Sequence, residues 1–174
     1  MLNKRIEKLT IEILDNLGIK SLPVPVDEVA KKRGLEIKAY DLGENVSGVL
    51  VMDAGKGTIG YSPTESKVRQ RFTIAHELGH YELHKQDSGL FIDKGFAVLF
   101  RDQNSSSGEI KKEQEANAFA AALLMPEKLL IKEIKKHNFD LGEEDAMKEL
   151  AKLFNVSVPA MTFRIANLNL FWKL

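Results

Sequence analysis

Three of the four histidines in this chain lie within the thirteen residues 72–84, FTIAHELGHYELH. Because residues i and i+4 of an α-helix face the same way, we expect the rings of His76 and His80 to reach one ion. Zn–N bonds of about 2.0–2.1 Å suit that spacing. Glu77 lies about 100° further round the helix, where it reaches a water beside the ion rather than the ion itself. This H-E-x-x-H pattern predicts two metal-ligating histidines and a glutamate that acts as general base.

A third ligand is predicted from residues 111–126, KKEQEANAFAAALLMP, which carry Glu113 and Glu115. A catalytic zinc ion takes three protein ligands and keeps one position open. The two glutamates point about 200° apart on a helix. Glu113 falls on the side of the inward-facing Ala120, whereas Glu115 leans toward Lys111, Lys112 and solvent. We therefore expect Glu113 to be the ligand, although a helix shifted by a few residues would reverse the choice.

Gly79 lies inside the same predicted helix, where glycine costs about 1 kcal/mol relative to alanine. That cost indicates that something needs to approach the backbone closely at Gly79. The residues around the motif are apolar on more than one side, so a buried helix must satisfy two imidazoles and a carboxylate, which a cation does directly. The alternative interpretation is a buried helix whose histidines are satisfied without a metal.

The elements that must position these residues run as helices, a small sheet and more helices, which predicts an α+β fold. Periodic apolar residues and glycine or proline boundaries indicate helices over residues 2–17, 26–34, 63–84, 109–125, 126–137, 143–154 and 159–168. Three short strands are expected at 35–42, 46–53 and 57–62. A turn at 53–57 joins the last two, and the short connections favour an antiparallel sheet.

Composition and charge exclude several classes of function. The 174 residues suffice for one domain with a core, and we expect residues 1–174 to form a single domain. With 25 basic and 25 acidic residues the net charge is zero, which gives no electrostatic drive toward nucleic acids or membrane surfaces. The absence of cysteine excludes thiolate catalysis and cysteine-bound zinc, and fits a reducing compartment. Since no signal peptide or membrane-spanning run is visible, we expect a cytoplasmic protein without a membrane partner.

The segments FTIAHELGHYELH, FRDQNSSSGEIKKEQEANAFAAALLMP and LAKLFNVSVPAMTFRIANL resemble the ImmA/IrrE family of zinc metallopeptidases, and the likeness covers essentially the whole chain. The resemblance implies a zincin-like fold with a gluzincin-like site. It implies one Zn²⁺ per chain, held by His76, His80 and Glu113, with Glu77 as general base and Asn117 orienting a ligand histidine. The implied activity is endopeptidase cleavage of a protein substrate, often a helix-turn-helix repressor. Manganese or iron would also fit this ligand set.

The sequence leaves alternatives open for the oxyanion donor and for the strand that would bind the substrate. The oxyanion of a tetrahedral intermediate needs a hydrogen-bond donor, for which Tyr61, Tyr81, His84 and Arg101 are candidates. Residues 86–108 are expected to form a loop that is interrupted by a strand over 95–100. That strand is expected to be either part of the core or an exposed edge to which an extended substrate adds.

Residues 141–170 have the rhythm of helix, turn and helix that occurs in DNA-binding modules. The second helix is mostly apolar and carries Arg164 as its only cation before Lys173, whereas a recognition helix needs several groups that contact bases or phosphates. We therefore expect a helical pair packed on the peptidase domain, without direct nucleic-acid binding. The competing hypotheses are a catalytically silent, zinc-containing regulatory module and a transcription factor that uses these helices.

Overall fold

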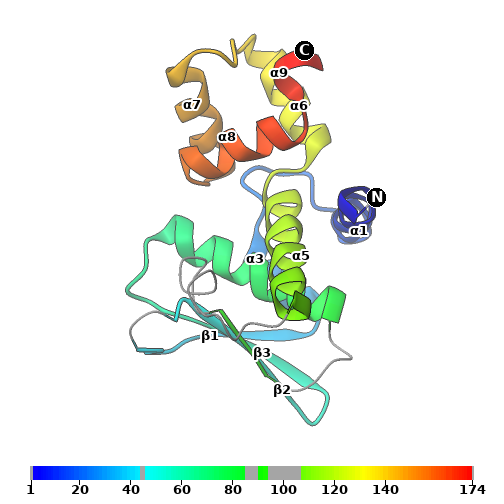
Figure 1. The fold of residues 1–174 in the computed structure, drawn as a ribbon, viewed down its shortest axis with the longest axis vertical. Coiled ribbons are helices and arrows are strands. Elements are labelled where there is room, and N and C mark those ends of the chain that lie inside the picture. Colours follow the sequence, from blue (N-terminus) through cyan, green and yellow to red (C-terminus); the bar gives the residue numbers. More distant parts are fainter. Residues whose placement is uncertain (1, 44–45, 85–89, 94–106, 174) are drawn as a thin grey trace. The chain divides into compact units, whose positions relative to one another are not determined.

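The computed structural model describes residues 2–43, 46–84, 90–93 and 107–173. The chain divides into two compact units, one made of residues 26–120 and the other of residues 1–25 together with 121–174 (Figure 1). Helices accompany one sheet in the described residues, so the predicted α+β class is confirmed. The single domain over 1–174, with residues 141–170 packed on it, stays a prediction.

The unit of residues 26–120 is built on a four-stranded sheet with the order β1-β3-β2-β4. The strands are β1 Leu35–Ala39, β2 Gly48–Asp53, β3 Lys56–Tyr61 and β4 Leu90–Asp93. β2 pairs antiparallel with β3 and β4, whereas β1 pairs parallel with β3. The prediction of an antiparallel sheet is therefore wrong for β1. Residues 40–47, which connect β1 to β2, are too many for a hairpin loop, so the two strands need not be neighbours. In the sheet, β3 lies between β1 and β2.

The loops of this sheet agree only in part with the sequence patterns. Ala54 and Gly55 have φ values of 44° and 82°, as the predicted tight turn between β2 and β3 requires. β4 falls within a segment that was expected to be loop. The strand expected over residues 95–100 lies outside the described residues.

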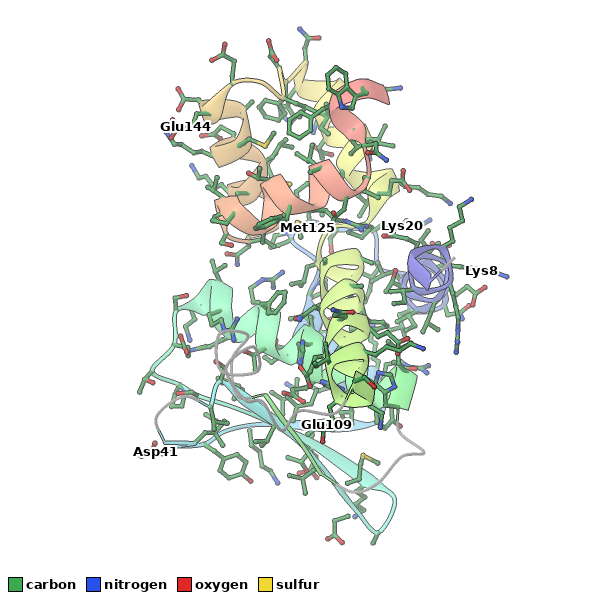
Figure 2. The ribbon with its side chains drawn as sticks, in the orientation of Figure 1. Lys8, Lys20, Asp41, Glu109, Met125 and Glu144 are labelled. Atoms are coloured by element: carbon green, nitrogen blue, oxygen red, sulfur yellow. The ribbon has the colours of Figure 1, made fainter. Side chains whose placement is uncertain are left out.

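Three helices belong to this unit in whole or in large part: α2 Val26–Lys32, α3 Lys67–His84 and α5 Ser107–Leu124. α3 packs against β2 and β3, where Leu50 and Ile59 are fully buried. α3 begins later than predicted because the Ser66 hydroxyl accepts a hydrogen bond from the Arg69 amide, which caps the helix at that point. Figure 2 follows α5 from the labelled Glu109 to Met125, just beyond its last residue.

Gly79 marks the place where α3 and α5 cross. A Cβ atom on Gly79 would lie 3.1 Å from the Cα of Ala116 and 3.1 Å from the Cβ of Phe119. These contacts confirm the expected close approach and identify α5 as the partner. The small residue lets the backbone of α5 lie directly against the part of α3 that carries the H-E-x-x-H motif.

Replacing Gly79 with alanine is expected to lower the free energy of unfolding by up to about 2 kcal/mol. Overpacking at the crossing costs about 1–3 kcal/mol, and the better helix propensity of alanine offsets about 1 kcal/mol of it. Urea denaturation of the metal-free protein measures the difference. A variant more stable than the wild type by about 1 kcal/mol would show that α5 moves aside without cost.

The other unit is helical in its described residues, with α1 Leu2–Asn16, α6 Glu127–His137, α7 Glu144–Phe154, α8 Val158–Asn167 and α9 Leu170–Lys173. Arg164 of α8 is only 5% exposed. Its Nε donates to the Met125 carbonyl at 3.0 Å, and its guanidinium pairs with the Glu7 carboxylate of α1 at 2.9 Å. These contacts fix α1 to α8. No helix in the described part of the chain is both long and apolar enough to cross a bilayer.

α7 and α8 form the helical pair that was predicted from the sequence. Asn155 ends α7 in the left-handed conformation, and the Ser157 hydroxyl caps α8 by accepting from the Ala160 amide. Arg164 is held by Glu7 and is therefore not presented to a phosphate. The exposed side chains of α8 are uncharged, namely Pro159, Thr162, Phe163, Ala166 and Asn167. Whether α8 binds DNA is not tested by these contacts, and the absence of direct nucleic-acid binding stays a prediction.

Candidate metal centre

His76, His80 and Glu113 bring three potential ligand atoms together between α3 and α5. The Nε2 atoms of the two histidines lie 3.0 Å apart. Glu113 places Oε2 3.1 Å from the Nε2 of His76 and Oε1 3.1 Å from the Nε2 of His80. The two imidazoles are buried, and the Glu113 side chain is 15% exposed. The structure thus groups the three residues that were predicted as ligands.

The spacing of these atoms fits a divalent metal ion. Two bonds of about 2.1 Å at a tetrahedral angle hold their ligand atoms roughly 3.4 Å apart. The observed separations of 3.0–3.1 Å differ from that value by only a few tenths of an ångström. Two imidazole nitrogens and one carboxylate oxygen form a common donor set of catalytic zinc sites, in which the fourth position stays open.

The ionisation of Glu113 also suits a ligand. Burial raises the pKa of Glu113, but the hydrogen bonds and charges of His76 and His80 outweigh burial and hold this pKa at about 2. The carboxylate is therefore anionic at neutral pH, as a metal ligand must be.

Asn117 lies one turn beyond Glu113 on α5 and contacts the first histidine. Its Oδ1 is 3.0 Å from the Nδ1 of His76. Because an amide oxygen only accepts hydrogen bonds, this contact requires the proton of His76 to be on Nδ1. In the neutral imidazole, in which a metal ion takes the place of the Nε2 proton, the lone pair of Nε2 points toward the other two ligand atoms, which is the tautomer that metal binding needs.

Glu77 lies outside the cluster of three ligand atoms and is fully buried. A Cβ atom on Gly48 would lie 3.0 Å from the Oε1 of Glu77 and 2.3 Å from a methyl carbon of Thr73. The first residue of β2 must therefore be glycine for the carboxylate and the strand to lie this close. Gly48 could not be predicted from the sequence, since the reason for a glycine there is a contact with residues on another element.

The structure contradicts the prediction that Glu115 faces solvent. The Glu115 side chain is 15% exposed, and its Oε2 lies 3.4 Å from the Nε2 of His84. Burial lowers the pKa of His84, and the neighbouring His80 acts in the same direction, whereas Glu115 and a hydrogen bond to the Lys112 backbone raise it. The sequence signal for this contact is the spacing of four residues between His80 and His84, because it places His84 on the face of α3 that carries His80.

The four candidate oxyanion donors are not brought together in the described part of the chain. Arg101 lies outside the described residues. His84 lies beside His80 in the row of rings, with ring centroids 5.7 Å apart. Tyr61 and Tyr81 are half-buried, and Tyr61 pairs across the sheet with Gly48, the residue against which Glu77 packs. Which of these four residues donates to the oxyanion stays a prediction.

Comparisons with known proteins find a matching family model, a similar sequence and a similar solved structure. The Peptidase_M78 family model, described as IrrE N-terminal-like domain, matches residues 30–166. Metallopeptidase ImmA of Bacillus subtilis (strain 168) is 31% identical over 105 residues, which are 60% of this chain and 56% of ImmA. A solved structure of a Mycobacterium tuberculosis transcriptional regulator matches with a TM-score of 0.60 and 16% identity, over 95% of this chain and 46% of that one. The latter likeness shows a shared fold, and this chain spans about half the length of both proteins.

Proposed function

The chain belongs to the metallopeptidase family with an IrrE N-terminal-like domain, and on that basis we propose that it is a zinc-dependent endopeptidase of the cytoplasm. The observation that carries this proposal is the triangle of ligand atoms from His76, His80 and Glu113, 3.0–3.1 Å apart. We propose that the substrate is another protein, and the family resemblance favours a helix-turn-helix repressor.

In the proposed mechanism, the residues of the metal centre have different roles. His76, His80 and Glu113 would hold the ion, and Asn117 would keep His76 in the required tautomer. A bound Zn²⁺ supplies a Lewis acid that polarises the scissile carbonyl and lowers the pKa of water toward neutrality. Glu77 accepts a proton from the attacking water and later donates it to the leaving amine nitrogen.

Co-incubation with a candidate repressor tests this function. The zinc-loaded protein is mixed with candidate helix-turn-helix repressors from the same genome, and the fragments are identified by mass spectrometry. We expect cleavage at one or a few bonds, and none after the metal is removed with a chelator. Cleavage that persists without metal would contradict a metallopeptidase mechanism. An intact repressor at full metal loading would contradict the proposed substrate.

Replacing Asn117 with alanine is expected to weaken zinc binding by about 10–100-fold, because a group that orients a ligand histidine contributes that much to metal affinity. Asn117→Asp keeps an acceptor for the His76 Nδ1–H and is expected to restore most of the affinity. Competition with a chromophoric chelator measures both dissociation constants. Equal zinc affinities for the alanine variant and the wild type would remove Asn117 from the centre.

A further inference from the structure

A third histidine continues the row that His76 and His80 begin on α3. His84 lies one turn beyond His80, with the two ring centroids 5.7 Å apart. It is only 7% exposed. Its nitrogens are not part of the group of three ligand atoms. A buried imidazole directly beside the centre therefore calls for a role other than that of a ligand.

The polar contacts of His84 reach α5 on both sides of Glu113. The Nε2 of His84 lies 3.4 Å from the Oε2 of Glu115. The ring also hydrogen-bonds to the backbone of Lys112. Lys112 directly precedes Glu113, and Glu115 follows it by two residues. One ring at the end of α3 thus contacts the turn of α5 from which Glu113 projects.

Glu113 needs a firm backbone because both of its oxygens are engaged, one with each histidine, at 3.1 Å. Its side chain has three rotatable bonds, and its residue lies in the second turn of α5, which begins at Ser107. The first turns of a helix lack part of their internal hydrogen bonding and open at a low cost in free energy. A contact from outside the helix is needed to hold such a turn in place.

We propose that His84 is a positioning residue, which holds the second turn of α5 and thereby keeps Glu113 in reach of His76 and His80. This inference rests on the proposed metal-binding role of these three residues. A side chain that only filled space would not need a nitrogen near the Glu115 carboxylate and a hydrogen bond to Lys112. The role predicts an effect on metal affinity that exceeds the effect on overall stability.

Two variants separate positioning from general packing. His84→Phe keeps a ring in place and removes both polar contacts with α5. The matched control is Arg33→Gln, which breaks the ion pair of Arg33 with Glu82, where the nitrogen and oxygen lie 2.6 Å apart. Glu82 is in the same last turn of α3 but points about 160° away from His84. Both variants loosen the end of α3, and only His84→Phe releases α5.

The readouts are the Zn²⁺ dissociation constant, from competition with a chromophoric chelator, and the melting temperature of the metal-free protein. We expect His84→Phe to bind Zn²⁺ about 10–100-fold more weakly and Arg33→Gln to bind like the wild type, with similar melting temperatures for the two variants. The visible absorption of the Co²⁺-loaded protein is expected to change for His84→Phe alone. Equal zinc affinity in His84→Phe and the wild type would overturn the inference, as would equal weakening in both variants.

Glu115→Gln provides a second route if His84→Phe does not fold. Its amide oxygen still accepts a hydrogen bond but carries no charge, so we expect a weakening of zinc binding of about 3–10-fold. An unchanged affinity would overturn the inference. If the wild type does not bind Zn²⁺, both the proposed function and this inference are wrong. If the wild type binds Zn²⁺ and His84→Phe and Glu115→Gln bind it equally well, only the inference is wrong.

Discussion

Replacing Glu77 with glutamine is expected to lower kcat/KM for the cognate protein by about 10²–10⁴-fold while zinc stays bound. Glutamine has nearly the shape of glutamate, so the close packing of residue 77 against Gly48 is kept. It cannot accept a proton from the attacking water, and the loss therefore falls on the chemical step. Single-turnover cleavage followed by gel densitometry, with the zinc content of the same samples, measures both quantities.

The matched control for this variant is Glu109→Gln, an isosteric change at an exposed residue of α5 (Figure 2). Glu109→Gln should cleave at the wild-type rate. If the wild type and Glu77→Gln process the partner equally, the protein is not a peptidase of this mechanism. That result would favour the competing hypothesis of a regulatory module that retains a metal site without catalysis.

Replacing Glu113 with glutamine is expected to weaken zinc binding by more than about 100-fold, since loss of a direct ligand exceeds the 10–100-fold effect of groups that only orient ligands. The amide removes the negative charge that balances the ion, and its oxygen is a weak zinc ligand. Two imidazoles remain, which do not complete the ligand set. Isothermal titration with Zn²⁺ and the metal content of the purified protein measure the loss, and cleavage should disappear with the metal.

Two comparisons make this experiment specific for Glu113. Glu109→Gln changes the same residue type one turn earlier on α5 and should leave the zinc affinity unchanged. Apo Glu113→Gln should keep the helical circular dichroism of the wild type, because the crossing at Gly79 does not involve residue 113. One zinc ion per chain at wild-type affinity in Glu113→Gln would show that the ligand set is different.

The candidate site could be predicted largely from local sequence because helical spacing determines which side chains share a face. His76 and His80 follow from that rule directly, and the choice of Glu113 over Glu115 follows from the apolar face of α5. The surroundings of Glu115 could not be predicted in the same way. The neighbouring lysines predict that Glu115 faces solvent. Its partner His84 lies on α3, 31 residues earlier in the chain, where no pattern in the sequence around Glu115 indicates it.

The sheet shows the same division between local and distant information. Alternating residues and the turn at Ala54 and Gly55 predicted β2 and β3. Alternation sets which face of a strand is buried, but it does not specify the neighbouring strand or its direction. The parallel pairing of β1 with β3 and the addition of β4 at the edge therefore required the structure. Contacts such as that between Glu7 and Arg164, 157 residues apart, leave no periodic signal at all.

The anchoring of Arg164 bears on where the protein can be shortened. The family match starts at residue 30, yet the carboxylate that neutralises this buried guanidinium belongs to Glu7. A version trimmed to the match would retain an uncompensated buried charge, a defect that costs about 3–5 kcal/mol. It would also discard Ile6, Ile13 and Leu14 from the apolar interior. The stretch that the family model matches is thus shorter than the stretch whose contacts support the fold, and truncation boundaries should follow the ion pair rather than the limits of the family match.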